Sequence, residues 1–235
     1  MEVSFAVAKV SKYASRESGD TLEMIERPHG GISLVLVDGQ RSGRSAKAIS
    51  NVVARKAVQL LAEGVRDGAA ARAAHDYLYT YRGGKVSATL NILSVDTRSR
   101  TVVISRNNPA PVLVYTAENG LLLLDAPSMV VGVNPNVKPN INEYPLSTGT
   151  IIVAYTDGLS HAGSVAGDKK YFPETVLLEL VKDSIFDPTR IADTLLQGAV
   201  DLDDGRPKDD ISVAVVAVSP REGDGARRLS GCLPI

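Results

Sequence analysis

The sequence has few of the residues that small metal-bound or disulfide-linked domains rely on. Its 235 residues include one cysteine, three histidines and no tryptophan. A lone cysteine excludes a disulfide framework and a cysteine-based zinc cluster, and it is typical of a reducing compartment. His29, His75 and His161 are too scattered for a spaced zinc motif. Cys232 lies in a polar tail with no phosphate-binding loop after it, which excludes a catalytic cysteine of that kind.

An excess of charge of either sign and long apolar runs are also lacking. The 26 Lys and Arg residues against 27 Asp and Glu residues give a net charge of −1, so we expect no nucleic-acid partner. The longest mainly apolar run, Ile211–Val218, is far shorter than the roughly 18 residues that cross a bilayer. Because no targeting segment is visible either, we expect a cytoplasmic protein that does not bind membranes.

Short apolar runs bounded by turn residues predict a chain rich in β-strands. We expect strands at Val3–Val10, Ile32–Val37, Val86–Val95, Thr101–Ser105, Val112–Tyr115, Ile151–Tyr155 and Ile211–Val218. The turns at 96–100 and 118–120 are short enough to close hairpins, which favours antiparallel sheets over a wound parallel sheet.

Two pairs of helices are expected among these strands. Apolar residues three and four apart, or a proline in the first turn, predict helices at Ser45–Leu61, Gly68–Tyr81, Pro173–Val181 and Pro188–Val200. Together the elements predict one α+β domain over residues 1–218, with helices packed on the sheets. Residues 219–235 are predicted to form a polar, glycine-rich tail.

Acidic residues recur where strands meet loops. Asp38 and Asp157 follow apolar strands, the pair at 209–210 precedes the last strand, and Asp20 follows Ser18-Gly19. A single Asp-Gly after a strand is most often only a turn. Carboxylates that share one cleft repel one another without a cation, so a shared cleft would imply a metal. Oxygen ligands select Mg²⁺ or Mn²⁺ over zinc.

The aspartates belong to longer motifs that follow one another along the chain. These motifs are Ser18-Gly19-Asp20, Val37-Asp38-Gly39, Asn108-Pro109-Ala110-Pro111, Tyr155-Thr156-Asp157-Gly158-Leu159 and Asp209-Asp210-Ile211-Ser212. With its motifs in this order, the chain resembles the PPM (protein phosphatase 2C-like) metal-dependent serine/threonine phosphatases. The resemblance is to their SpoIIE-type branch. The resemblance covers about residues 18–218 and implies an α/β/β/α sandwich of two antiparallel sheets flanked by helix pairs.

The resemblance also implies a metal site in a cleft at one edge of the sandwich. Two ions, Mn²⁺ or Mg²⁺, would be held there, and Asp38 would bridge them and position the hydroxide that attacks phosphorus. The other ligands would be the carbonyl of Gly39 and the carboxylates of Asp20, Asp157 and Asp209. Asp210 would support these ligands from behind.

The implied substrate is phosphoserine or phosphothreonine on a bacterial regulatory protein. Within the branch the chain most resembles the RsbX-type phosphatases of the stressosome, so we expect a stand-alone enzyme acting on a phosphorylated STAS-domain protein. A different phosphorylated anti-sigma-factor antagonist is the nearest alternative substrate. A second interpretation is a catalytically weak scaffold that only binds a STAS or kinase partner. Metal-stimulated hydrolysis would distinguish the two.

The loop after Asp38-Gly39 departs from the family pattern because it carries Arg41 and Arg44 where small residues are usual. As substrate-binding residues, either would contact the phosphate or an acidic partner surface. The plainer interpretation is a solvated loop in which Ser42 or Ser45 caps the next helix.

Several further side chains have both a functional and an ordinary interpretation. Arg16 could contact phosphate, and His29 or His161 could donate a proton to the leaving serine oxygen, but a plain place on the surface is the more common role for each. We expect Tyr77, Tyr79 and Tyr81 to be packing residues and not a recognition surface.

Overall fold

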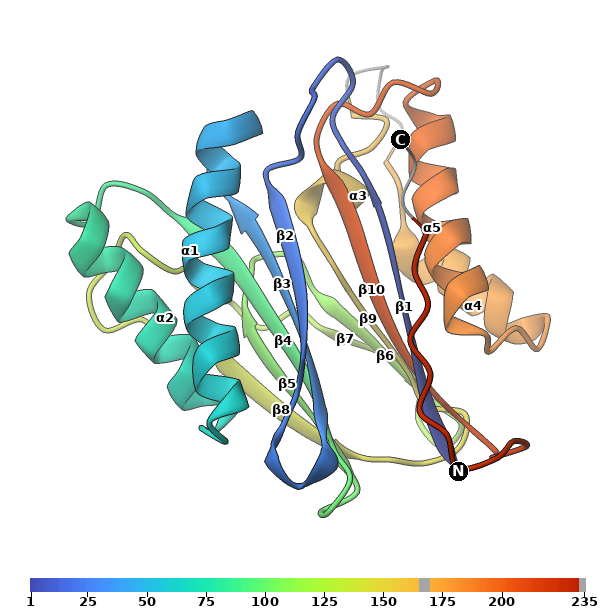
Figure 1. The fold of residues 1–235 in the computed structure, drawn as a ribbon. Coiled ribbons are helices and arrows are strands. Elements are labelled where there is room, and N and C mark those ends of the chain that lie inside the picture. Colours follow the sequence, from blue (N-terminus) through green and yellow to red (C-terminus); the bar gives the residue numbers. More distant parts are fainter. Residues whose placement is uncertain (165–169, 233–235) are drawn as a thin grey trace.

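The computed structural model describes residues 1–164 and 170–232 and arranges them in four layers (Figure 1). Two five-stranded antiparallel sheets lie face to face, and a pair of helices covers the outer face of each. The predicted α+β class and the α/β/β/α sandwich are therefore confirmed.

Each sheet mixes segments that are distant in the sequence. Sheet I contains, in spatial order, β2 (Asp20–Glu26), β3 (Ile32–Gly39), β4 (Ala88–Asp96), β5 (Thr101–Asn107) and β8 (Asn140–Pro145). Sheet II contains β1 (Glu2–Val10), β10 (Ile211–Ser219), β9 (Ile151–Tyr155), β6 (Val112–Thr116) and β7 (Gly120–Leu124). Because β1 and β10 pair along their whole length, the two ends of the domain fold together.

The helices form the two pairs that periodicity predicts. Sheet I is covered by α1 (Gly43–Ala62) and α2 (Asp67–Arg82), and sheet II by α4 (Pro173–Lys182) and α5 (Pro188–Leu202). Two short helices, η1 (Pro28–Gly30) and α3 (Asp157–Ser160), lie in connections. On α1 the apolar positions Ile49, Val53, Ala57 and Leu61 are buried, as expected for a helix that turns one stripe toward a sheet.

Three apolar cores hold the layers together. Alternate residues of a strand point to opposite faces, so Leu34 enters the core between the sheets and Val35 enters the core under α1 and α2. The core between the sheets contains Leu34, Leu93, Val95, Val102, Ile104, Val112, Val114, Leu146, Ile152, Ala154, Ala214, Val216 and Val218. Since both faces of β3 are buried, its sequence is mainly apolar at successive positions and is easily recognised as a strand.

The edge strands β2, β7 and β8 are not predicted by the sequence patterns. Half-exposed strands carry fewer apolar residues: Glu23 and Glu26 of β2 are exposed, and β8 alternates exposed with half-buried positions. The turn at 118–120 does indicate a hairpin, and β7 is its short second arm.

Beyond β10, residues 220–232 have no regular secondary structure. Arg227 reaches back to the β2–β3 connection, where its Nη1 lies 3.4 Å from Glu26 Oε1 and its Nη2 donates to the carbonyl of Gly30. The last three residues of the predicted tail lie outside the described part of the chain, and the division at residue 218 stays a prediction. None of the helices in the two described ranges has the length and hydropathy of a membrane span.

His75 joins α2 to the connection between β7 and β8. Its side chain is 2% exposed, and its Nδ1 accepts a 3.0 Å hydrogen bond from the backbone N–H of Gly132. Burial lowers the pKa of His75, opposed by the nearby charge of Asp76. The ring of Tyr79 packs against the imidazole. The imidazole is therefore held neutral, with its proton on Nε2.

We predict that His75 makes the fold sensitive to mild acid. Because its pKa is lower in the folded protein, the unfolded chain binds more protons near and below about pH 6.5, and stability falls as the pH drops from there. The substitution His75→Gln keeps an acceptor for Gly132 and should lose less stability than wild type between about pH 7 and about pH 5 in urea melts. The exposed His161→Gln variant should keep the wild-type slope. Equal slopes for wild type and His75→Gln would contradict the prediction.

Candidate active site

The aspartates of sheet I gather at one edge because antiparallel pairing brings the end of one strand beside the start of the next. Asp38, near the end of β3, pairs with Asp20 at the start of β2 and with Thr89 near the start of β4. The backbone N–H of Asp38 also donates to Thr89 Oγ1 at 3.3 Å. Asp20 and Asp38 are therefore cross-strand neighbours.

Sheet II brings its own carboxylates to the same place. β9 ends just before Asp157, and Asp209 immediately precedes the start of β10, which pairs with the end of β9. The backbone N–H of Thr156 donates to the carbonyl of Ser212, and the N–H of Ser212 donates to Thr156 Oγ1, each at 3.0 Å. These bonds hold the loops that carry Asp157 and Asp209 side by side.

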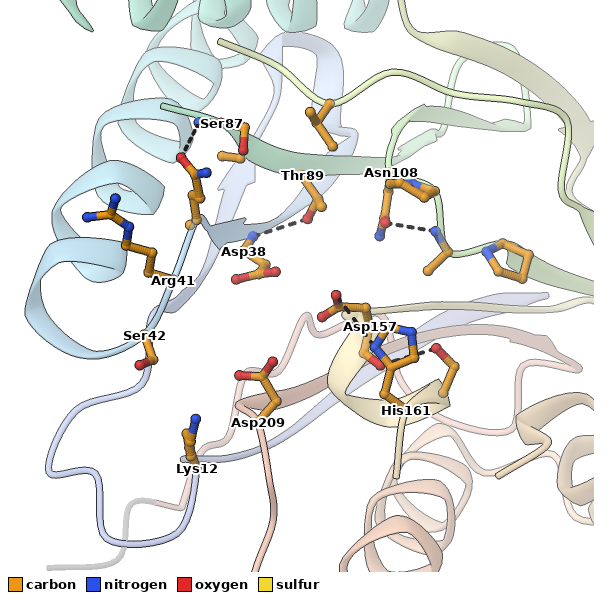
Figure 2. A pocket seen from close by; sticks show the side chains of 18 residues that line it. Lys12, Asp38, Arg41, Ser42, Ser87, Thr89, Asn108, Asp157, His161 and Asp209 are labelled. Carbon is orange, nitrogen blue, oxygen red and sulfur yellow. Dashed lines mark hydrogen bonds and ion pairs between the residues drawn. The ribbon is translucent and has the colours of Figure 1, made fainter. Parts of the chain in front are cut away.

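A pocket of about 790 Å³ opens where the two sheet edges meet. Figure 2 shows the carboxylates of Asp38, Asp157 and Asp209 facing one another across it. Two bases lie beside them: Lys12 lines the pocket next to Asp209, and His161 Nδ1 lies 3.8 Å from Asp157 Oδ2. Three separate segments of the chain thus contribute one carboxylate each.

Asn108 fixes the opposite wall of the pocket. Its Nδ2 donates to the carbonyl of Tyr155 at 3.1 Å, and its Oδ1 accepts from the N–H of Ala110 at 2.9 Å. The guanidinium of Arg106, which is fully buried, donates to the carbonyl of Asn108 at 2.5 Å. The motif at 108–111 therefore lines the pocket, and its backbone is held from behind.

Asp20 is fully buried beside Asp38 and is bound by both sheets. Its Oδ2 accepts hydrogen bonds from Ser212 Oγ at 2.6 Å and from Thr156 Oγ1 at 3.1 Å, both from sheet II. Its other carboxylate oxygen, Oδ1, is buried and has no hydrogen-bond partner. Two ammonium groups, Nζ of Lys9 and Nζ of Lys47, donate to its backbone carbonyl at 2.6 Å and 2.7 Å.

Burial and mutual repulsion raise the pKa values of these carboxyls. The pKa of Asp38 is raised to about 9, first by burial and then by the charges of Asp20 and Asp157. Burial is also the largest cause that raises the pKa values of Asp20 and Asp209. Without a cation, the cluster therefore holds a proton at neutral pH.

Two glycines allow the backbone to close around the aspartate loops. A Cβ at Gly39 would lie 2.1 Å from the carbonyl oxygen of Ala46 in α1, and a Cβ at Gly158 would lie 2.2 Å from the carbonyl oxygen of Asp210. Both distances are far inside van der Waals contact. A side chain at either position would therefore push α1 or the start of β10 away from the pocket.

The residues predicted for the site reach this edge in different ways. The pocket is lined by Asp38, Gly39, Asp157 and Asp209. Asp20 lies behind that surface, buried next to Asp38. Asp210 binds backbone: its Oδ1 accepts from the N–H of Lys12 at 2.9 Å, and its Oδ2 from the N–H of Gly19 at 2.8 Å. Their roles as metal ligands or supporting residues stay predictions.

The two arginines of the departing loop differ in position. Arg41, with φ of 78°, lines the rim of the pocket, but Figure 2 shows its side chain pointing away from the three carboxylates. Arg44 is exposed on α1 and is not among the pocket residues, and Ser42 is the N-cap residue of that helix. Arg16 is exposed outside the pocket, and the side chain of His29 lies outside the described part of the structure.

Some residues of the site have no signal in the sequence patterns. Lys12 stands two residues after the end of β1, and only the pairing of β1 with β10 reveals that it faces Asp209. Asp203 is buried and accepts backbone hydrogen bonds from Gly163 and Lys208, which fixes the loop before Asp209. Both roles depend on contacts between distant segments, and a local motif does not carry them.

The donor set at this edge fits a hard divalent cation. Among residues 1–164 and 170–232, no three Asp, Glu, His or Cys side chains are close enough to hold an ion as they stand. The available donors are nevertheless oxygens, as Mg²⁺ and Mn²⁺ prefer. A cation would also give Asp20 Oδ1 a partner and offset the repulsion that raises the pKa of Asp38.

We predict that neutralising Asp38 stabilises the metal-free protein. Because its pKa is raised in the folded state, stability falls as the pH rises between about 4 and about 9, and Asp38→Asn removes that loss. In EDTA the variant should melt at a higher temperature than wild type, by roughly 2–4 °C for each kcal/mol gained in the free energy of unfolding. The difference should be larger at about pH 8 than at about pH 5. Mn²⁺ should raise the melting temperature of wild type only. Asp193→Asn, exposed on α5, is the control. A lower melting temperature of Asp38→Asn in EDTA would show that repulsion does not dominate.

Comparison with known sequences identifies relatives over most of the chain. A family model described as Stage II sporulation protein E (SpoIIE) matches residues 28–219. The chain is 20% identical over 213 residues to Stage II sporulation protein E of Priestia megaterium, which covers 91% of this chain and 36% of that protein. The chain thus spans about a third of the length of this curated relative.

Solved structures share the fold. The PP2C phosphatase domain of SpoIIE from Bacillus subtilis, solved with a fragment of its regulatory domain, matches with a TM-score of 0.79 at 19% identity, covering 93% of this chain and 64% of that one. RsbX in complex with magnesium matches with a TM-score of 0.70 at 14% identity, covering 92% of this chain and 96% of that one. The chain therefore has the fold of the PP2C phosphatase domain of SpoIIE. The SpoIIE-type branch predicted from the motifs is confirmed: the chain belongs to the SpoIIE family.

Proposed function

We propose that this chain is a metal-dependent phosphatase that hydrolyses phosphoserine or phosphothreonine on a protein. One observation carries the proposal: Asp38, Asp157 and Asp209 come from three separate segments and face one another across a single pocket. An acidic pocket repels a phosphate group unless cations are present, so phosphate chemistry there requires a metal. Membership of the SpoIIE family supports the same reaction.

The cofactor that we propose is Mn²⁺ or Mg²⁺, with two ions in the full site. Asp38, Asp157 and Asp209 would hold them from the pocket surface, together with the carbonyl of Gly39, and Asp20 would contribute its free Oδ1. When bound, such ions activate water for attack on phosphorus and offset the charge of the phosphoryl oxygens. The magnesium bound to RsbX is consistent with this choice.

The chain's own bases have places in the reaction. Lys12 reaches the pocket beside Asp209 and would attract a phosphoryl oxygen. His161, exposed at the mouth next to Asp157, would give a proton to the departing serine or threonine oxygen. Arg41 on the rim is better placed than Arg44 to contact the substrate, although its side chain points away from the carboxylates.

The substrate that we propose is a phosphorylated STAS-domain regulatory protein in the cytoplasm. Similarity of the fold to RsbX and the resemblance of the motifs to stressosome phosphatases support this choice. The pocket opens between two sheet edges and is wide enough, at about 790 Å³, to admit a phosphorylated side chain from a folded partner.

We predict that hydrolysis depends on the pocket carboxylates and on added metal. Asp38→Asn and Asp209→Asn should each lower Mn²⁺-stimulated turnover of p-nitrophenyl phosphate at least about a hundredfold, because each removes a ligand charge. EDTA should abolish wild-type turnover, and the exposed Asp193→Asn should leave it unchanged. Equal turnover of Asp38→Asn and wild type would refute the proposed mechanism. If wild type shows no metal-stimulated turnover, the binding-scaffold interpretation is the better one.

A further prediction concerns the cation that meets the phosphate. Lys12→Ala should raise KM for p-nitrophenyl phosphate at least about tenfold, since one charge-assisted hydrogen bond is worth about 1.5–3 kcal/mol. Arg44→Ala, which removes a cation from outside the pocket, should leave KM unchanged. Steady-state kinetics at fixed Mn²⁺ would measure both. The assignment of Lys12 fails if the two variants behave alike.

A further inference from the structure

The layer formed by α1 and α2 carries a charge that the chain as a whole does not. Residues 41–85, which span both helices and the adjoining connections, contain nine Lys or Arg residues and three Asp or Glu residues, a net charge of +6. The whole chain has a net charge of −1, so the remaining residues carry −7. Basic charge is therefore concentrated on one outer layer of the sandwich.

Most of these cations are available to a partner. The exposed ones are Arg41, Arg44, Arg55, Arg66, Arg72, Arg82 and Lys85. Asp67, one of the three acids, is buried in an ion pair of 2.8 Å with Arg27 of the β2–β3 connection. None of the ion pairs found within the two described ranges involves the seven exposed cations. Their charge is left uncompensated by neighbouring carboxylates.

Two tyrosines form the centre of this surface. Tyr77 and Tyr81, one turn apart on α2, are 46% and 59% exposed, and their rings stack with centroids 5.9 Å apart. Lys56 of α1 lies 5.8 Å over the ring of Tyr77, and Arg82 lies 5.0 Å over the ring of Tyr81. These four side chains form a continuous basic–aromatic strip. Tyr77 and Tyr81, expected to be packing residues, do pack on each other, but on the exposed face of α2.

The basic–aromatic strip leads to the pocket. α1 begins at Gly43, directly after pocket residues Arg41 and Ser42. Arg82, the strip residue at the end of α2, is followed a few residues later by Ser87, which also lines the pocket. Gln40 and Ser87 tie these two segments together: the N–H of Gln40 donates to the carbonyl of Ser87 at 3.0 Å, and the N–H of Ser87 donates to Gln40 Oε1 at 3.2 Å. Figure 1 shows α1 running away from the end of β3 that bears the pocket.

We propose that the basic–aromatic strip is the docking surface for an acidic segment of the phosphoprotein substrate. The proposal rests on the proposed function, since the phosphorylated residue would occupy the pocket while its acidic neighbours lie on α1 and α2. Uncompensated cations attract carboxylates over about 10 Å at moderate salt and steer association. Half-exposed tyrosines add apolar contact area at little entropic cost.

An acidic protein segment fits this surface better than a nucleic acid or an anionic membrane does. The rings of Tyr77 and Tyr81 stack on each other, and Lys56 and Arg82 lie over them, so a stacking base would have to compete with these contacts. The remainder of the chain, with its charge of −7, would repel an extended polyanion or a charged bilayer. A short acidic segment confined to the strip avoids that repulsion.

Charge reversal on the strip tests the proposal through KM. Lys56→Glu with Arg82→Glu should raise KM for a phosphoserine peptide with acidic flanks about tenfold at low salt. KM for the same peptide with neutral flanks, and turnover of p-nitrophenyl phosphate, should stay near wild type. Lys182→Glu with Arg190→Glu reverses the same charge on exposed residues of α4 and α5 and should change none of these values. An unchanged KM for the acidic peptide in the strip variant would overturn the proposal.

A binding measurement separates docking from catalysis. A fluorescein-labelled acidic peptide without phosphate should bind wild type, lose about tenfold in affinity on the strip variant, and bind the control variant normally. This result would support docking even if wild type showed no metal-stimulated turnover, an outcome that refutes the proposed function alone. Single-stranded DNA and phosphatidylserine vesicles are measured in parallel. Tighter binding of either probe than of the acidic peptide, lost in the strip variant, would overturn the choice of partner.

Discussion

The arrangement of the site depends on one buried carboxylate, that of Asp20. Its backbone belongs to sheet I, but its Oδ2 is bound by Thr156 and Ser212 of sheet II, so the side chain fixes the distance between the two sheets at the edge where the pocket opens. A buried charge that loses its hydrogen bonds costs several kcal/mol. The core between the sheets is apolar and lacks the directional restraint that these hydrogen bonds impose. Lys9 and Lys47, which donate to the carbonyl of Asp20, add the rest of the restraint.

The same contact makes the site costly for the fold. Burial and repulsion raise the pKa of Asp38 to about 9, and Oδ1 of Asp20 stays without a partner. A sequence selected only for stability would replace such a cluster with apolar residues, as buried ion pairs can often be replaced. The cluster breaks the general rule that buried charges are paired, and proteins break such rules mainly where function requires it. The tight approach of α1 at Gly39 keeps the cluster in place despite the repulsion, because the helix leaves the strand no room to relax.

Sequence patterns predict the parts of this protein that depend on neighbours along the chain. β3, β9 and β10 are buried on both faces and therefore carry continuous apolar runs, while the edge strands β2 and β8 lack such runs and pass unnoticed. Asp38 stands out because a motif surrounds it. Lys12 does not, since only the pairing of β1 with β10 brings it to the pocket. Helical spacing decides that Tyr77 and Tyr81 share one face, but the sequence does not say which face points to solvent.

The near-zero net charge of the chain conceals two separate charged regions with opposite tasks. Carboxylates gathered in the pocket attract divalent cations, and the cations of α1 and α2 attract anions, so direct pairing between the regions would weaken both. The loop between them keeps them apart: Arg41, in a left-handed conformation with φ of 78°, turns its guanidinium away from the three carboxylates. Under the proposed function, an acidic phosphoprotein would be attracted first by the helices, and its phosphate would enter the pocket once bound cations offset the charge of the carboxylates.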